Sequence, residues 1–413
     1  MEFDIVIIGG GLVGASLAAA LKNSGLRLAL IEGQPLPSLP SPQSSGETTS
    51  HSTKPASGRG SERENQSLIS EWDSRIYAFT PGNVAFLREC GVWQRLDMSR
   101  VQQVEEMRVF GDTGSRLNFS AYEIGAPELA FIMESRLLQH ALWEDLSGQD
   151  NLTLLHPAQC AEMSLMEEAA LLKLKDGREI RAKLIVGADG RDSWARHQAV
   201  MPEVATPYHQ HGVVANFSIG KAHRGIAYQW FKPESILALL PLPGKRISIV
   251  WSVSPEQSAE LLALTQEEFC ARVSAASNHT LGELQVITPP AAFALRVLNL
   301  AHLTKPRLAL IGDAAHNVHP LSGQGVNLGL RDVRELVKVL SQRGALDCGE
   351  LSLLRRYEKA RQGDIMSMQL TTDTLKNLFV NTNPLLRTLR NAGLAATNKF
   401  SPLKKMLVRH ALN

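Results

Sequence analysis

Glycine and acidic residues follow an apolar segment at the start of this chain. The motif GGGLVG places Gly9, Gly11 and Gly14 at the spacing G-x-G-x-x-G, which lets a pyrophosphate approach the backbone at a helix N-terminus. The strand-like run FDIVII precedes the motif, the helix-like run ASLAAALKNSG follows it, and a second strand, LRLALIE, ends at Glu32. A carboxylate at that point is suited to ribose hydroxyls. These elements predict a dinucleotide site without separating FAD from NAD.

Two later segments also carry an apolar strand into a turn that contains aspartate. Residues 170–186 predict a β-hairpin, and its second strand leads directly into Asp189 and Gly190. The strand RLALI leads in the same way into Gly312 and Asp313. Together with the N-terminal motif, these two turns form a combination that is more specific than a single glycine motif.

The composition is that of a globular protein large enough for two domains. The 413 residues are 44% hydrophobic and 20% charged, and the net charge of +2 provides no basic field for nucleic acid. The four cysteines match no metal or redox spacing, so we expect reduced thiols and no metal site. The opening MEFDIVIIGG predicts a strand rather than a signal peptide, and no apolar run is long enough to span a membrane. We therefore expect a cytoplasmic location.

Residues 34–66 differ in composition from the rest of the chain. This segment is rich in serine and proline and has no aromatic residue, so it cannot bury enough apolar surface to offset its ordering entropy. We predict a disordered insert, with a partner-binding or regulated loop as the alternative. The ordered chain resumes at WDSRIYAFTPGN, where Arg75 either pairs with an acid on the surface or lines the dinucleotide cleft.

With its three motifs in this order, the chain resembles the class A flavoprotein monooxygenases, which are aromatic hydroxylases with the para-hydroxybenzoate hydroxylase fold. The resemblance implies that FAD is the cofactor, that NAD(P)H is the co-substrate, and that Asp313 binds the ribityl chain of FAD. It also implies that Asp189 and Gly190 serve both FAD binding and the approach of NAD(P)H. Arg136 falls where the family often places an FAD-contacting arginine, although its segment is also a good amphipathic helix.

The implied fold is α/β, with a Rossmann-like FAD-binding domain, an antiparallel β-sheet substrate domain and C-terminal helices. The expected boundaries are residues 1–78, 128–198 and 290–345 for a discontinuous FAD-binding domain, residues 79–127 and 199–289 for the substrate domain, and residues 346–413 for the helical region. Residues 210–253 contain short alternating segments typical of antiparallel strands, which in the family form the ceiling of the substrate pocket. Candidate lining residues are Phe217, Trp230, Leu239, Pro241 and Trp251, with plain core packing as the alternative for each.

Residues 319–332, HPLSGQGVNLGLRD, give a narrower resemblance to the ubiquinone-biosynthesis hydroxylases. These enzymes act on prenylated phenols, which implies a polyprenylated phenol and O2 as substrates, a flavin C4a-hydroperoxide as the oxygen donor, and a ubiquinone-biosynthesis protein complex as a partner. Two alternatives stay open: a soluble aromatic substrate, or a flavin-dependent prenyl-lipid reductase without an oxygen demand. A flavin-dependent halogenase is disfavoured, because no two tryptophans have the spacing W-x-W.

The same segment predicts how the protein contacts the flavin ring. Gly323, Gln324 and Gly325 let backbone N–H groups approach the ring without intervening side chains. A helix that begins near Val326 directs its positive end toward the negative charge of the reduced ring. Asn327 is expected to cap or orient this loop.

Three residues are candidates for a catalytic role: His316, His319 and Pro320. Each histidine has two possible roles, as a proton shuttle for the substrate phenol or as a hydrogen-bonding scaffold in the cofactor loop. We favour the scaffold role for both. Pro320 is expected to form part of an apolar wall beside the ring.

The chain from Thr371 onward is predicted to be helical and basic. Asp373 is its only acid, against seven lysines and arginines that are interspersed with leucines. The pattern predicts an amphipathic basic surface. This surface either docks peripherally on the anionic inner membrane, where a prenylated substrate would reside, or packs against the FAD-binding domain or a protein partner.

Overall fold

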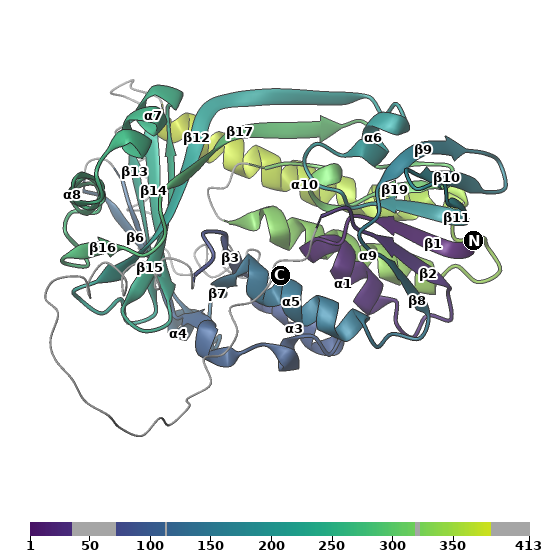
Figure 1. Ribbon diagram of the computed structural model, residues 1–413. Coiled ribbons are helices and arrows are strands. Elements are labelled where there is room, and N and C mark those ends of the chain that lie inside the picture. The colour runs from purple at the N-terminus through teal and green to yellow at the C-terminus, as the bar shows by residue number, and fades with distance from the viewer. Residues whose placement is uncertain (35–71, 112–113, 319–322, 381–413) are drawn as a thin grey trace, which may run out of the picture.

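The computed structural model describes residues 1–34, 72–111, 114–318 and 323–380, with side chains in the last range as far as Thr374. The chain forms two lobes, and the N-terminus belongs to the first of them (Figure 1). Residues 35–66 of the predicted insert, the loop residues His319 and Pro320, and most of the basic C-terminal region lie outside the described residues.

The first lobe is built on a mainly parallel sheet. Its strands, in spatial order, are β18 (Thr304–Lys305), β19 (Leu308–Leu310), β11 (Glu179–Gly187), β1 (Glu2–Ile8), β2 (Leu28–Ile31) and β8 (Leu152–Leu155). β10 (Ala170–Leu174) forms the predicted hairpin with β11, and β9 (Cys160–Leu165) pairs with β10. The side chains of Ile5, Val6 and Ile7 are completely buried, as expected for a parallel strand that is covered on both faces.

Helices pack against this sheet and against one another. They include α1 (Leu12–Ala20), α5 (Ser135–Leu146), α9 (Gln324–Ser341) and α10 (Leu351–Val380). They also include α3 (Pro81–Glu89), α6 (Trp194–Gln198), η1 (Trp93–Arg95), η2 (Met98–Arg100) and η3 (Gly312–Ala314), whereas α4 (Ala121–Ile124) contacts the sheet of the second lobe. α1 contacts both α5 and α9, and α9 contacts α10. None of the described helices is long and apolar enough to cross a membrane.

The second lobe is built on a mainly antiparallel sheet. Its strands, in spatial order, are β16 (Leu284–Val286), β12 (Glu203–Ile219), β15 (Arg246–Val253), β14 (Ser235–Leu242), β13 (Ile226–Lys232), β5 (Glu106–Phe110) and β6 (Arg116–Ser120). β17 (Ala291–Leu300) pairs with β12, and these two long strands reach toward the first lobe (Figure 1). The expected domain boundary at residue 290 thus falls at the start of a strand that links the lobes.

The outer face of the second sheet points away from the first lobe and is covered by α7 (Pro255–Ala263) and α8 (Gln266–Ala276) (Figure 1). Four candidate lining residues are buried in one cluster with Phe269 of α8: Phe217, Trp230, Leu239 and Trp251. Pro241 pairs with Ile247 of the same cluster. These side chains therefore do not form the ceiling over the first lobe, and their prediction as substrate-pocket residues is wrong. For the four residues of the cluster, the alternative interpretation, core packing, is correct.

The inner face of the second sheet carries the alternate side chains. Val214 pairs with Val250, and Val250 pairs with Ala238, so these three residues form one row across β12, β15 and β14. Leu240 lies in the next row. All four are only half-buried. They give the inner face an apolar surface that points toward the first lobe.

A third, smaller sheet joins the two lobes. It consists of β3 (Ile76–Phe79), β7 (Ala130–Glu134) and β4 (Gln102–Val104). Ile76 and Ile132 of this sheet pack in one cluster with Ala227 and Leu242 on the inner face of the second lobe.

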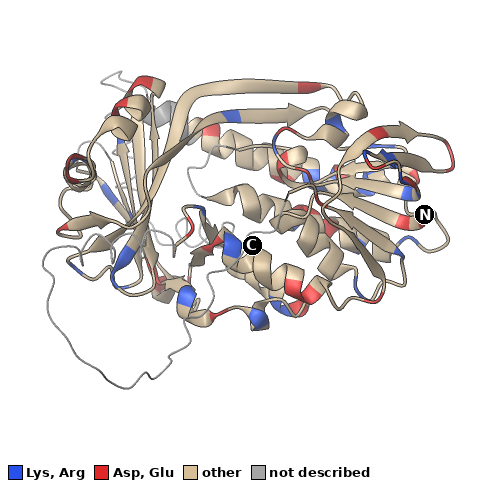
Figure 2. Ribbon diagram, viewed as in Figure 1, with Lys and Arg blue, Asp and Glu red and all other residues tan. Residues whose placement is uncertain are grey.

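Acidic and basic residues are interspersed over both lobes, and no large region of one sign is visible in this view (Figure 2).

Candidate functional site

The first turn joins β1 to α1 and uses its three glycines in two different ways. A Cβ on Gly14 would lie 2.0 Å from the carbonyl oxygen of Gly9, and a Cβ on Gly9 would lie 2.5 Å from the carbonyl oxygen of Ala188. Gly9 also has a φ of +104°. Gly11 differs, because a Cβ there would meet nothing within 4 Å. Gly9 and Gly14 thus permit close packing, whereas Gly11 keeps open a space that an approaching phosphate can use.

Glu32 and a residue that the sequence did not single out hold this turn from two sides. The Glu32 carboxylate accepts hydrogen bonds from the backbone N–H groups of Gly10 and Gln34, each at 2.7 Å. The indole Nε1 of Trp143, on α5, donates to the carbonyl oxygen of Gly10 at 2.9 Å. Trp143 looked like an ordinary apolar residue of an amphipathic helix, so no local pattern indicated this contact.

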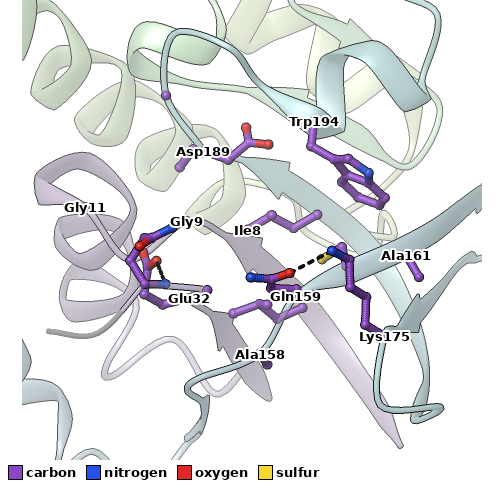
Figure 3. Close-up of a pocket in the computed structure, with 16 residues that line it drawn as sticks. Ile8, Gly9, Gly11, Glu32, Ala158, Gln159, Ala161, Lys175, Asp189 and Trp194 are labelled. Carbon is purple, nitrogen blue, oxygen red and sulfur yellow. Dashed lines mark hydrogen bonds between the residues drawn. The ribbon is translucent and has the colours of Figure 1, made fainter.

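A cleft of about 790 Å³ opens in front of the first turn (Figure 3). Its lining includes Gly9, Gly11, Glu32, Ala158, Gln159, Cys160, Lys175, Asp189, Gly190 and Trp194. Glu32, Ala158 and Gln159 lie on one side of the cleft, and Asp189 and Trp194 lie on the opposite side (Figure 3). Lys175 Nζ donates to Gln159 Oε1 at 2.8 Å, which fixes the amide at the centre of the cleft. The structure therefore brings the first and second predicted motifs together in one cavity.

The second turn follows β11 and is held by its own aspartate. Asp189 accepts hydrogen bonds from the Ser193 hydroxyl at 2.5 Å and from the backbone N–H of Ala195 at 2.9 Å. Gly190 has a φ of +83°, which glycine adopts without strain. The guanidinium of Arg196 is buried and donates to the carbonyl oxygen of Ala314 at 2.9 Å, so it ties the second turn to the third.

The third turn follows β19 and rests on a buried carboxylate of α9. Asp332 Oδ2 accepts the backbone N–H of Gly312 at 2.8 Å and lies 2.6 Å from His316 Nε2, while Oδ1 accepts from Arg361 Nε at 2.7 Å. Burial alone would raise the pKa of the Asp332 carboxyl, but His316, Arg361 and the Gly312 N–H together hold it below its ordinary value. His316 is buried in this network, which favours the scaffold interpretation.

Asp313 has the opposite environment within the same turn. Its side chain is exposed, although protein surrounds much of it. The surrounding protein raises the pKa of the Asp313 carboxyl, and the charges of His316 and Arg191 oppose this shift. The solvent that reaches the side chain limits the size of the shift. Asp313 is therefore available to a ligand, whereas Asp332 is fully occupied by the protein.

The N-terminus of α9 completes this edge of the first lobe. Gly323 has a φ of +62° and precedes the helix, which begins at Gln324, two residues earlier than predicted. A Cβ on Gly325 would meet nothing within 4 Å. The first turn of α9 contains no acidic residue, so its N–H groups present a positive end.

Asn327 is completely buried and fixes the start of α9 against β3 and α3. Its Oδ1 accepts from the backbone N–H of Thr80 and from Asn83 Nδ2, both at 2.9 Å, and its Nδ2 donates to the carbonyl oxygen of Ala78 at 2.7 Å. The same Nδ2 donates to the Gly323 carbonyl at 3.2 Å. The predicted orienting role of Asn327 fits these contacts, whereas Asn83 as its partner was not expected.

The two candidate arginines do not line the cleft. Arg75 is exposed, and its backbone N–H donates to Asp73 Oδ1 at 3.0 Å. Arg136 lies 3.9 Å from Glu134. Burial raises the pKa of the Tyr77 hydroxyl, Asp313 adds to this shift and Arg75 opposes it. The charges of Arg75 and Asp313 thus act in opposite directions on the same hydroxyl.

The site residues fit a bound flavin dinucleotide. Gly11 opens on the cleft, Glu32 lines it, Asp313 exposes its carboxylate, and the N-terminus of α9 has no acidic residue in its first turn. The family described as FAD binding domain matches residues 72–369 of this chain. The fold and the site together define a FAD-dependent monooxygenase.

Curated relatives are similar along the whole chain. It is 33% identical to ubiquinone hydroxylase UbiL of Rhodospirillum rubrum, with 99% of this chain and 89% of that protein covered. It is 32% identical to 3-demethoxyubiquinol 3-hydroxylase of Escherichia coli, with 99% and 98% covered. It is 30% identical to the mitochondrial ubiquinone biosynthesis monooxygenase COQ6 of Homo sapiens, with 99% and 92% covered. The chain belongs to the ubiquinone hydroxylase family of class A FAD-dependent aromatic monooxygenases.

Solved structures agree on the fold. The crystal structure of PqsL from Pseudomonas aeruginosa aligns with a TM-score of 0.75 and 22% identity, covering 96% of this chain and all of PqsL. That of p-nitrophenol 4-monooxygenase from Pseudomonas putida aligns with a TM-score of 0.75 and 16% identity, covering 100% and 98%. The expected α/β fold with a FAD-binding domain is confirmed.

Proposed function

We propose that this enzyme hydroxylates the aromatic ring of a polyprenylated phenol in ubiquinone biosynthesis, with NAD(P)H as the reductant. The relatives' names support the pathway, because all three are hydroxylases or monooxygenases of ubiquinone or its precursors. The observation that carries the proposal is the inner face of the second lobe. There, Val214, Ala238, Leu240 and Val250 leave an apolar surface half-exposed toward the first lobe, which suits a substrate with an apolar tail.

We propose roles for the site residues that follow from their positions. Gly11 and the N-terminus of α1 bind the pyrophosphate, Glu32 binds the adenosine ribose, and Asp313 accepts hydrogen bonds from the ribityl chain. Bound FAD supplies the redox chemistry with NAD(P)H and O2. The N–H groups at Gln324, Gly325 and Val326 stabilise negative charge that develops on the flavin ring.

We propose a positioning role for Asp189 and Gly190 and a ligand-contacting role for Arg75 and Arg136. Asp189 holds the second turn through Ser193 and Ala195, so its removal would displace one wall of the cleft. Arg75 and Arg136 lie outside the cleft, and we propose that they act nearer to the isoalloxazine side or at the approach of NAD(P)H. From the sequence pattern alone, we propose that Pro320 forms part of an apolar wall beside the ring and that His319 is a scaffold of the cofactor loop.

The test of this function combines an enzyme assay with a metabolite profile. Purified enzyme reconstituted with FAD should consume NAD(P)H and O2 only when a prenylated phenol is present, and should form a product one oxygen atom heavier. Cells that lack the gene should accumulate one under-hydroxylated prenylphenol. NAD(P)H oxidation with a hydrogenated product and no O2 uptake would support the reductase instead, and an unchanged quinone pool would support a soluble aromatic substrate.

We also propose a peripheral membrane contact, which rests on the basic composition of the chain beyond Thr371, and a biosynthetic complex, which rests on the resemblance to ubiquinone-biosynthesis hydroxylases. Flotation of the full chain with anionic vesicles tests the membrane contact. The full chain should float, and a chain that ends at Val380 should not. Co-purification of the tagged full chain with other quinone-biosynthesis proteins tests the complex.

A further inference from the structure

A second pocket lies on the opposite face of the substrate-domain sheet from the flavin side. Its volume is about 290 Å³, and it is enclosed by the ends of β13, β14 and β15 and by α7 and α8. The lining residues are Lys232, Ser235, Trp251, Val253, Gln257, Glu260, Leu261, Arg272, Ala275 and Ala276. Trp251, first a candidate for the substrate pocket, lies on the outer face of the sheet, and no other residue named above for FAD or substrate belongs to this set, so the pocket is separate from the active site.

The walls of this second pocket are mostly apolar and include one flat aromatic surface. Trp251 and Val253 come from β15, Leu261 comes from α7, and Ala276 comes from α8. All four belong to or border the buried cluster beneath the helices. A cavity of this size is at the lower end of the range for small-molecule sites, so it fits a single ring rather than a dinucleotide or a prenyl chain.

Polar groups in the second pocket lack partners within the part of the chain that the structure describes. Lys232 and Ser235 face each other as a pair in the β13–β14 hairpin. Neither the Lys232 ammonium nor the Ser235 hydroxyl makes a hydrogen bond or ion pair with the described residues. Ser235 is only 9% exposed as a residue, and the indole Nε1 of Trp251 is a buried donor without a hydrogen-bond partner among the described residues. Burial also lowers the pKa of the Lys232 ammonium, because no carboxylate compensates for it.

The other charges of the second pocket cancel. Glu260, the one acid among the lining residues, lies 2.5 Å from the guanidinium of Arg272 in an ion pair that joins α7 to α8. The uncompensated charge of the pocket is therefore the positive charge of Lys232. An anion beside this ammonium would gain a charge-assisted hydrogen bond and would also offer an acceptor to Ser235.

We propose that this pocket binds a small aromatic carboxylate, with the carboxylate on Lys232 and Ser235 and the ring against Trp251. The site is independent of the proposed hydroxylation. Its position makes it a regulatory site: Trp251 lies between Val250 and Ser252 on β15, and Val250 belongs to the apolar surface of the opposite face. A ligand that packs against Trp251 thus acts on the strand that carries the proposed substrate ceiling.

The probe for this site is 4-fluorobenzoate, observed by fluorine NMR with the FAD-loaded enzyme. Its neutral analogue, 4-fluorobenzamide, has the same shape and tests the charge. The Lys232→Gln variant removes the cation, and Ala275→Phe fills the mouth of the pocket from the surface of α8 while Lys232 is kept. Lys245→Gln is the matched control, because Lys245 is an exposed lysine in the β14–β15 turn of the same sheet.

We expect 4-fluorobenzoate to bind without changing the flavin absorption spectrum. Its affinity should fall by about tenfold or more in Lys232→Gln and Ala275→Phe, as expected for the loss of a charge-assisted hydrogen bond or of the space itself, and should not change in Lys245→Gln. The benzamide should bind about tenfold more weakly or worse. The proposal is overturned if the wild-type enzyme does not bind the probe, or if binding persists in both variants with a perturbed flavin spectrum, which would place the probe in the active site.

Discussion

His316 and Asp332 are joined through a 2.6 Å contact between Nε2 and Oδ2, and that same carboxylate oxygen accepts the backbone N–H of Gly312. One buried carboxylate thus holds the turn of the G-D motif and the histidine that follows it. Its second oxygen accepts from Arg361 of α10. The third cofactor turn is therefore fixed by two helices that follow it in sequence, and changes in either helix should be felt at Asp313.

Asp332→Asn should destabilise the enzyme more than the loss of one hydrogen bond would. The substitution removes the carboxylate that Arg361 and His316 share and leaves Arg361 with Asp364 alone, and breaking a buried pair from one side costs about 3–5 kcal/mol. We expect a matching loss in the free energy of unfolding and faster release of FAD. Denaturant unfolding and flavin fluorescence measure the two effects. Asp176→Asn, in the exposed hairpin turn, is the control and should change neither quantity.

The same residue should govern part of the acid sensitivity. The folded-state pKa of Asp332 lies below its value in the unfolded chain, which is about 3.9. Its stabilisation is therefore complete above that pH and is lost as the pH falls through the folded-state pKa. In the wild-type enzyme the melting temperature should fall steeply below about pH 4, whereas in Asp332→Asn it should start lower and fall less steeply. Parallel curves for the two proteins would contradict this assignment.

Gly11→Ala and Gly14→Ala should separate cofactor binding from folding. A Cβ on Gly11 meets no protein atom and its φ of −68° suits alanine, so the FAD-free protein should lose no more than about 1 kcal/mol of stability while FAD binding is strongly weakened. A Cβ on Gly14 would meet the Gly9 carbonyl oxygen at 2.0 Å, so the protein itself should lose about 1–3 kcal/mol or more. Gly148→Ala, at an open position, is the control. Equal destabilisation of the Gly11 and Gly14 variants would contradict the distinction.

Asn327→Ala should loosen the start of α9. The substitution leaves the buried Thr80 N–H without its partner, which costs about 1–3 kcal/mol, and removes the donor to the half-buried Ala78 carbonyl. We expect lower stability and a changed flavin spectrum, because Gly323 loses its contact with the same amide. Asn299→Ala, at an exposed site on β17, should have neither effect. Thermal unfolding and visible absorption provide the measurements.

Trp143→Phe should weaken FAD binding without a large loss of packing. The phenyl ring keeps most of the apolar contact but cannot donate to the Gly10 carbonyl. One net hydrogen bond is worth about 0.5–1.5 kcal/mol, so the Kd for FAD should rise by about 2- to 12-fold. Trp93→Phe replaces another buried tryptophan of the same core and should leave the Kd unchanged. Equal Kd values in both variants would show that the indole does not position the turn.

The sequence was most informative where a motif and its flanking elements are contiguous. The turn at Gly9, the hairpin before Asp189 and the strand before Gly312 could all be predicted, because each is a local pattern of glycine, aspartate and apolar residues. Asp332 and Trp143 could not be assigned in this way, because their partners lie 20 and 133 residues away and their own segments look like ordinary helices.

The faces of the second sheet show a different limit. Strand alternation places Trp251 and Val250 on opposite sides of the sheet. It does not say which of these two side chains points toward the first lobe. That choice depends on α7 and α8, which cover the face that carries Trp251. Only the tertiary packing of these helices made Val250 the residue that points toward the site.

The strand order of the first lobe has a consequence during synthesis. β1 is made first, but its neighbour β11 ends at Gly187, and the next strand, β19, ends only at Leu310. At about 5–20 residues per second, a ribosome needs about 15–60 s to travel from the end of β1 to the end of β19. Throughout that interval β1, whose residues Ile5, Val6 and Ile7 are completely buried in the finished protein, lacks its finished sheet. Nascent chains of this enzyme should therefore depend on chaperones that shield the N-terminal segment until the last third has emerged.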